Sequence, residues 1–219
     1  MNIKSFIYSI LLTMGSLMAS CDKHEDLIDY TLKVGNIYCM DGTIVPPGEF
    51  PDMGKQAVGV VVRVGEKEED YQAIVVGLRD IGMAAYADTL YTIRSVSSDI
   101  TLFNGKHNTA ALMNEYTEEE RLNPGAAIKC TNYTCGNISG WHLPSVAEVK
   151  AAGNGTVRRS IEIAGGAAFK EDWYMTSTID GSSEETTVNY NFCINMAEGR
   201  VVSSYKTEAH LVRPFLVIR

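Results

Sequence analysis

The stretch Ser-Gly-Trp-His-Leu-Pro-Ser-Val-Ala-Glu at residues 139–148 constrains the fold of this chain more than any other segment. Ser145 and Glu148 have the spacing of a capping box, in which each of the two side chains bonds a free backbone amide at the start of a helix. Pro144 cannot belong to a helix interior, so it sets the direction in which the chain reaches the cap. The spacing therefore predicts a short helix over residues 146–152.

The residues beside this helix predict how the segment packs. Trp141 and Leu143 alternate with His142, so an extended segment directs the two apolar side chains to the core and His142 outward. Gly153 is expected to end the helix in the left-handed conformation. Together these residues indicate a rigid corner, and a purely structural role explains them without a ligand.

The remaining patterns predict an α+β fold. Apolar, β-branched runs at residues 58–64 and 71–78 predict two buried strands joined by the charged loop 65–70, and residues 79–104 are expected to be irregular. Asn108 or Thr109 is expected to cap a helix over residues 110–116. Further helices are expected from Thr117 and over residues 157–164, and further strands over residues 173–178, 188–194, 200–205 and 211–218.

The order of motifs resembles that of DUF1566-type proteins, the Fibrobacter succinogenes major-domain-like family. The corner matches the pattern W-x-L-P-S/T-x-x-E of that family. Further matches lie at residues 41–43, 105–109, 173–178 and 212–214. The family domain is similar to the C-type lectin fold. The resemblance implies such a domain over residues 32–219, mostly antiparallel sheet with a few short helices, and with the first and last strands meeting in one sheet.

The first residues predict export and lipid anchoring. Lys4 precedes an apolar run at residues 6–18 that is too short to cross a bilayer comfortably, so residues 1–20 are expected to be a signal peptide. The run ends in Leu-Met-Ala-Ser-Cys, which resembles a bacterial lipobox and makes Cys21 the expected lipid attachment site. An ordinary secretory signal with an incidental cysteine is the alternative. Residues 21–31 are expected to be an acidic tether, and the resulting location is the outer membrane, with the cell surface as one option.

Two further modifications depend on this export. The segment Asp-Thr-Leu at residues 88–90 resembles the short sequon that is glycosylated in exported Bacteroides proteins, although so short a pattern also arises by chance. Thr89 is the residue that this sequon would modify. Cys39, Cys130, Cys135 and Cys193 remain after lipidation, and their pairing is left open. Cys130 and Cys135 can close a small loop, whereas buried free thiols explain Cys39 and Cys193 equally well.

The sequence contains no recognisable catalytic motif. The histidines lie far apart, and neither an H-E-x-x-H pattern, a C-x-x-C pair nor a Gly-rich phosphate loop occurs. The paired E-P-N and W-N-D motifs of calcium-dependent lectins are absent as well. A net charge of −8 without a run of Lys or Arg argues against a nucleic-acid partner. We therefore expect a protein that is not an enzyme and that holds no metal and no cofactor.

The expected function is binding. Lectin-like folds usually bind through their C-terminal half, where this chain carries Tyr and Asn side chains that suit a binding face. The candidate ligand-binding residues are Asn189, Tyr190, Asn191, Asn195 and Tyr205. Residues 180–185 are expected to form a flexible loop beside them. The solvent face of a hairpin is the alternative explanation of these residues.

Three functions follow in order of preference. The first is a cell-envelope lipoprotein that binds a glycan or protein ligand. The second is a non-catalytic structural component of a surface appendage or envelope complex. The third is an enzyme on the same scaffold, which requires His and Cys side chains to converge in one cleft.

Overall fold

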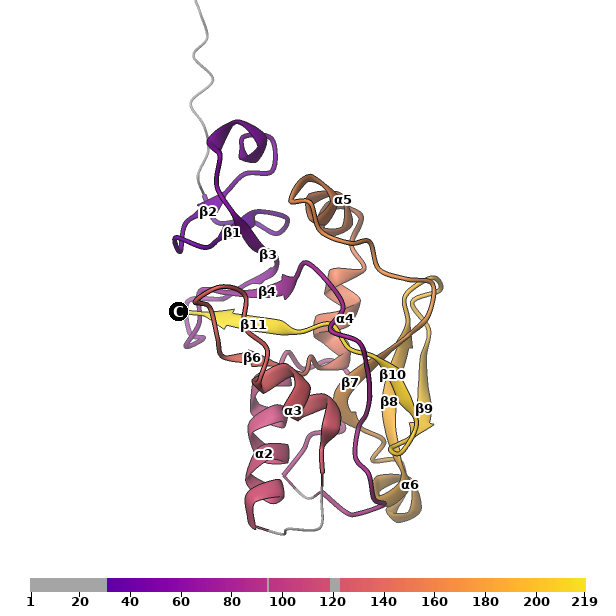
Figure 1. Cartoon of the computed structure of the whole chain (residues 1–219). Coiled ribbons are helices and arrows are strands. Elements are labelled where there is room, and N and C mark those ends of the chain that lie inside the picture. Colours follow the sequence, from indigo (N-terminus) through magenta and orange to yellow (C-terminus); the bar gives the residue numbers. More distant parts are fainter. Residues whose placement is uncertain (1–30, 94, 119–122) are drawn as a thin grey trace, which may run out of the picture.

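The computed structural model describes residues 31–93, 95–118 and 123–219, and its strands form two sheets (Figure 1). The first sheet has the order β2-β1-β3-β4-β11-β6 and the second the order β5-β10-β7-β8-β9. The first contains β1 (Ile37–Cys39), β2 (Ile44–Val45), β3 (Ala57–Val64), β4 (Ala73–Gly77), β6 (Trp141–His142) and β11 (Phe215–Ile218). The second contains β5 (Met83–Ala85), β7 (Trp173–Ile179), β8 (Tyr190–Asn195), β9 (Val201–Tyr205) and β10 (Ala209–Leu211).

Helices lie between and beside the sheets. They are the 3-10 helix η1 (Phe50–Met53) and the α-helices α2 (Gly105–Glu118), α3 (Gly125–Thr131), α4 (Val146–Ala152), α5 (Gly155–Ile163) and α6 (Glu184–Asn189). Nearly all strand pairs are antiparallel, the exception being β7 with β10. The predicted α+β class, mostly antiparallel with short helices, is confirmed. No helix among the described residues is long and apolar enough to cross a membrane.

The first sheet is built around the hairpin of β3 and β4. Both strands are apolar and β-branched, and Val60 lies opposite Val76 with both side chains fully buried. Gly59 permits their close approach, because a Cβ atom at this position would lie 2.4 Å from the carbonyl oxygen of Val76. The loop between the strands is charged, as predicted. The two buried strands inferred from the sequence are therefore confirmed.

β1 and β11 belong to this same sheet, with β3 and β4 between them, as expected for the first and last strands. The single strand predicted over residues 211–218 is wrong, however. β10 ends at Leu211 in the second sheet and β11 begins at Phe215 in the first. Pro214 cannot donate to a strand ladder, and it stands where the chain crosses from one sheet to the other.

Three hydrophobic clusters explain how the layers pack. Figure 1 shows α4 between the two sheets, where Val149 packs with Val60 of β3 and Ile194 of β8 in the first cluster. A second cluster lies around Leu112, where α2 and α3 pack on the second sheet. The third covers the opposite face of the first sheet and includes Trp141.

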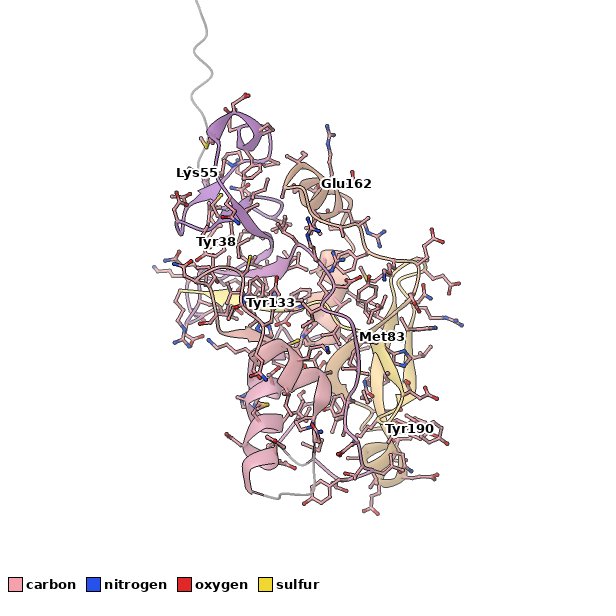
Figure 2. All side chains as sticks on the ribbon, in the orientation of Figure 1. Tyr38, Lys55, Met83, Tyr133, Glu162 and Tyr190 are labelled. Atoms are coloured by element: carbon pink, nitrogen blue, oxygen red, sulfur yellow. The ribbon has the colours of Figure 1, made fainter. Side chains whose placement is uncertain are left out.

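Trp141 anchors that third cluster. Its side chain is 1% exposed, and Tyr133, labelled in Figure 2, packs edge-on against it with ring centroids 5.3 Å apart. The first sheet is therefore buried on both faces. The burial of Trp141 and Leu143 predicted from their alternation is confirmed.

Several predicted helix boundaries are wrong for identifiable reasons. α4 has the predicted bounds, but Gly153 after it has φ −69°, which is right-handed, so no left-handed terminator occurs there. α2 begins at Gly105 rather than after Asn108 or Thr109, and it runs through Thr117, where a new helix was expected. Because the side chains of Asn108 and Thr109 bond neighbouring elements, they do not cap their own helix.

The predicted flexible loop at residues 180–185 is wrong in its second part. Glu184 and Glu185 form the first turn of α6, and Ser183 and Thr186 form a reciprocal capping box at its start. The strand predicted from residue 188 accordingly begins only at Tyr190.

Candidate functional site

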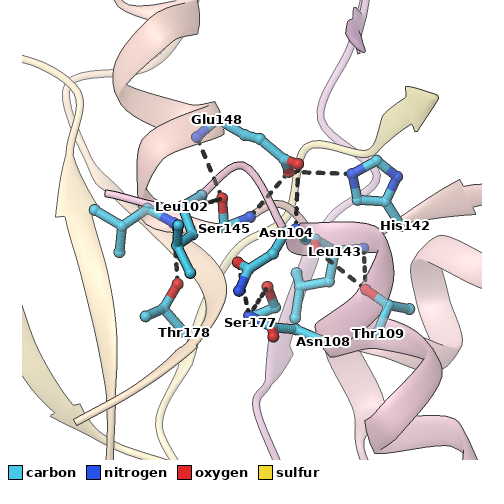
Figure 3. Close-up of polar contacts among 12 residues, drawn as sticks. Leu102, Asn104, Asn108, Thr109, His142, Leu143, Ser145, Glu148, Ser177 and Thr178 are labelled. Carbon is cyan, nitrogen blue, oxygen red and sulfur yellow. Dashed lines mark hydrogen bonds and ion pairs between the residues drawn. The ribbon is translucent and has the colours of Figure 1, made fainter. Parts of the chain in front are cut away.

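The corner around α4 is a buried polar hub, which Figure 3 shows in detail. One oxygen of Glu148, Oε2, lies 3.1 Å from Nε2 of His142 and accepts a 3.0 Å bond from the backbone amide of Ser145. Its other oxygen, Oε1, accepts from the amide of Gly105, the first residue of α2, at 3.2 Å. The capping box predicted from the sequence is confirmed, and one carboxylate joins β6, α4 and α2.

Serine and threonine side chains extend the hub to other segments. Ser145 donates to the carbonyl oxygen of Leu102 at 2.8 Å, which fixes the chain that enters α2. Thr109 of α2 accepts from the amide of Leu143 and donates to its carbonyl oxygen. Thr178 of β7 accepts from the amide of Val146 at 3.1 Å, so the hub also reaches the second sheet.

His142 faces the hub and not solvent, so the predicted outward orientation is wrong. The side chain is 2% exposed, because both faces of its sheet are covered and alternation no longer separates core from solvent. Its Nδ1 has no hydrogen-bond partner among the described residues. Since the hub is enclosed, it organises the fold and does not present a ligand-binding surface.

Gly105 is required by this close packing. A Cβ atom here would lie 2.2 Å from Oε2 of Glu148 and 2.7 Å from the amide nitrogen of Ser145. We expect Gly105→Ala to lower the free energy of unfolding by about 2 kcal/mol despite the better helix propensity of alanine, because the hub must move apart. Urea denaturation measures the change. Gly155→Ala, at the start of α5 with open space around it, is the matched control and is expected to stay near wild type.

The predicted ligand-binding residues do not form one face. Tyr190 and Tyr205 stack across β8 and β9 with ring centroids 4.4 Å apart, and Tyr205 is 45% exposed. Figure 2 labels Tyr190, which lies close to α6. Asn191, by contrast, is 0% exposed and bonds inward, so it lies out of reach of a ligand.

The other two asparagines take part in the local fold, Asn195 through its side chain and Asn189 through its backbone. The side chain of Asn195 accepts from the amides of Ala197 and Glu198 and so shapes the turn into β9. The carbonyl oxygen of Asn189, which is half-buried, accepts from the amide of Lys206. Of the predicted ligand-binding residues, Tyr190 and Tyr205 form the aromatic contact, and the role of this pair in binding stays a prediction.

Lys206 follows Tyr205 in the chain, and its residue type and sequence neighbours do not reveal its burial. It is 0% exposed, and its ammonium donates to the carbonyl oxygens of Tyr91 and Thr187 at 2.9 and 2.7 Å. The lysine thus ties α6 and the irregular segment after β5 to the turn between β9 and β10. Burial lowers the pKa of Lys206 to about 8.

This pKa makes the contribution of Lys206 depend on pH. Below pH 8 the lysine is charged in both states, so its desolvation cost is fully present. Between about pH 8 and the unfolded value of 10.5 the unfolded chain binds more protons, so stability relative to a Lys206→Met variant rises with pH. We expect that relative rise to be about 2–3 kcal/mol, measured by denaturant titration at several pH values. The buried thiols titrate in both proteins, so they cancel in the difference, and a flat difference curve would contradict the assignment.

One cluster brings together the side chains that an enzyme on this scaffold would need. Oγ of Ser204 lies 2.7 Å from Nε2 of His210 and 2.7 Å from Oε2 of Glu208. In a catalytic triad the acid bonds the ring nitrogen that does not face the nucleophile. Here Glu208 instead lies 3.9 Å from Nε2 itself, and Ser204 is only 7% exposed. The arrangement therefore lacks the orientation that activates a serine.

The three fully buried cysteines, Cys39, Cys130 and Cys193, do not supply a nucleophile either. Cys39, Cys130, Cys135 and Cys193 are all free thiols, so the loop closure considered for Cys130 and Cys135 is wrong. Burial raises the pKa of Cys193 to about 12 and also raises the pKa of Cys39 and Cys130, which keeps these groups as unreactive thiols. Within the described part of the chain, no three His, Cys, Asp or Glu side chains are placed to hold a metal ion.

Two predicted modification sites remain predictions. Cys21 and the signal peptide lie outside the described residues. Thr89 is exposed in the irregular segment after β5, where Asp88 accepts a bond from the amide of Asn123 at 3.0 Å. Exposure suits modification of Thr89 but does not test it.

Open cavities lie elsewhere on the surface. The largest of those described has a volume of about 510 Å³ and lies between the start of β3, the end of β4 and the ends of α3 and α5. Another, of about 460 Å³, lies between the first turn of α2 and the end of β11. Neither contains a residue of the predicted ligand-binding set.

Comparison with known proteins relates this fold to a solved structure. No protein-family model matches the chain, and no curated protein sequence matches it. A fimbrial protein from Bacteroides ovatus ATCC 8483 matches with a TM-score of 0.66 and 14% sequence identity. The match covers 85% of this chain and 49% of that protein, so this chain corresponds to about half of its length. The DUF1566-type family and the lectin-like fold are not confirmed, and the fold is similar to that of a Bacteroides fimbrial protein.

Proposed function

We propose that this chain is a non-catalytic component of a cell-surface appendage that acts through contacts with other proteins. The observation that carries the proposal is the shared fold with a fimbrial protein over 85% of the chain. The geometry described above supports it: Glu208 lies on the same ring nitrogen of His210 as Ser204, so among the described residues it does not orient the imidazole as in a triad, and Cys193 is a buried thiol. The second function inferred from the sequence is thus preferred to the first.

The proposal includes the lipid anchor. A lipidated Cys21 followed by an acidic tether would hold the folded domain at the outer membrane, as stable attachment needs more than one acyl chain. The exposed Tyr190–Tyr205 pair is the proposed protein contact, since stacked tyrosines supply rigid area at low entropic cost. No group of the described residues favours glycan binding, so binding of a glycan is treated as one outcome of the test below.

Immunogold electron microscopy of the source bacterium tests the proposal. Antibodies against residues 32–219 should label filaments or their bases, and a Cys21→Ser variant should lose that labelling and appear in the soluble fraction. Label confined to the periplasm, without any appendage, would contradict the appendage role. Co-purification of an appendage protein that is lost in Tyr205→Ser, but not in the equally exposed Tyr116→Ser on α2, would identify the contact surface. Binding to a glycan array, without co-purification of a protein, would instead favour a glycan-binding function.

A further inference from the structure

The cavity of about 510 Å³ beside β3 is lined by both apolar and polar side chains. Val58, Leu78 and Ile163 contribute aliphatic side chains from β3, from the end of β4 and from α5, and Phe50 adds an aromatic ring. Ligand cavities of this size usually combine such an apolar lining with a few polar groups that orient the ligand. The question is therefore which ligand the polar groups fit.

The polar lining residues supply hydrogen-bond donors and a positive charge. Tyr133 makes a side-chain hydrogen bond with Cys135 and lies close enough to Arg79 to be affected by its charge. Burial raises the pKa of Tyr133, so its hydroxyl stays protonated at neutral pH, and its single proton would turn from Cys135 to a bound acceptor. Arg79 is exposed and makes a single 3.3 Å bond to the carbonyl oxygen of Gly165, with no ion-pair partner among the described residues.

The charged residues that line the cavity favour a ligand with a negative charge. Arg79 and Lys55 line the cavity, and no Asp or Glu does, although the whole chain has a net charge of −8. Lys55 is engaged by Asp41 at 2.5 Å, so Arg79 is the cation whose ionic hydrogen-bonding capacity is left over. A guanidinium offers paired donors that match the two oxygens of a carboxylate.

We propose that this cavity binds a small organic carboxylate with an apolar body, with the carboxylate on Arg79 and Tyr133 and the body against the aliphatic side chains of Val58, Leu78 and Ile163. Such a ligand is either a free acid or the C-terminal carboxylate of an apolar peptide. The inference is independent of the appendage role, because labelling of filaments does not involve the cavity.

Cys135 provides a reporter inside the site. It lines the cavity and is half-buried, whereas Cys39, Cys130 and Cys193 are 0% exposed. In the full chain, 3-phenylpropionate should slow the reaction of Cys135 with N-ethylmaleimide, followed by peptide mass spectrometry so that Cys21 is read separately. The neutral 3-phenylpropanamide should protect at least tenfold less well at equal concentration, since an ionic hydrogen bond is worth roughly a factor of ten in affinity.

Variants separate this site from unspecific binding. Arg79→Gln should lower the affinity for 3-phenylpropionate by about tenfold or more. Arg159 is an exposed residue of α5 that does not line the cavity, so Arg159→Gln should leave the affinity unchanged. An undiminished affinity in Arg79→Gln, equal protection by the amide, or no protection at about 10 mM ligand would overturn the proposal. A peptide that ends in phenylalanine with a free carboxylate distinguishes the sources. Tighter binding of the peptide than of the free acid assigns a peptide C-terminus, and weaker binding assigns a free acid.

Discussion

Replacing Glu148 by alanine is expected to lower the free energy of unfolding by about 4 kcal/mol. The carboxylate is 0% exposed and serves His142, Ser145 and Gly105 at once. Its removal leaves buried donors without an acceptor, and each such group costs about 1–3 kcal/mol. Chemical denaturation followed by circular dichroism measures the loss.

Two variants show that the loss belongs to the hub. Glu148→Gln keeps the shape but replaces one acceptor oxygen by a donor, so it is expected to recover only part of the stability. Glu162→Ala removes an exposed glutamate from α5 and should leave the unfolding midpoint unchanged. A loss below about 1 kcal/mol in Glu148→Ala would mean that water or a rearrangement satisfies the donors, and the hub would then not organise the fold.

Breaking the ion pair between Arg213 and Asp80 is expected to cost a similar amount. Arg213 is 1% exposed, and its Nε donates to Oδ1 of Asp80 at 2.7 Å. The guanidinium also donates to the carbonyl oxygens of Ala167 and Ala168 and lies 4.1 Å from the centroid of the Phe169 ring. Asp80→Ala leaves this buried cation uncompensated, which typically costs about 3–5 kcal/mol.

The double variant distinguishes a broken pair from a lost contact. Replacing both partners, as in Asp80→Leu with Arg213→Met, removes the uncompensated charge and should recover much of the loss. Thermal unfolding of Asp80→Leu, of Arg213→Met and of the double variant measures the coupling between the two side chains. Asp70→Ala is the control, because the pair of Asp70 with Arg219 is well exposed and its removal should not change the midpoint. Simple addition of the two single losses would contradict a direct interaction between Asp80 and Arg213.

The parts of this fold that sequence predicted are those with local causes. The Ser145–Glu148 capping box and the run of valines in β3 each depend on neighbouring residues, and both were placed correctly. The predictions are wrong where contacts between distant segments determine the orientation of a side chain. His142 was directed outward because alternation assumes one solvent-facing side, and the sequence does not show that Tyr133 and Trp141 cover the second face.

The candidate sites show the same limit. Tyr190 and Tyr205 were selected for their residue types, and the pairing of β8 with β9 brings them together. Asn191 was selected for the same reason but lies inside the sheet, which residue type cannot reveal. The cavity around Arg79 was missed entirely, because its lining comes from segments between residues 50 and 165 that meet only in the folded chain.

Native-state hydrogen exchange of the Gly105 amide tests most directly whether the corner unites the helices and both sheets. Its proton is bonded to Glu148 at the first residue of α2, where amides ordinarily lack a partner within the helix. If the hub opens only when the whole domain unfolds, this amide exchanges with the same opening free energy as the amides of β3. Exchange at the rate of a frayed helix end would show that the corner opens by itself, and would contradict its central place in the fold.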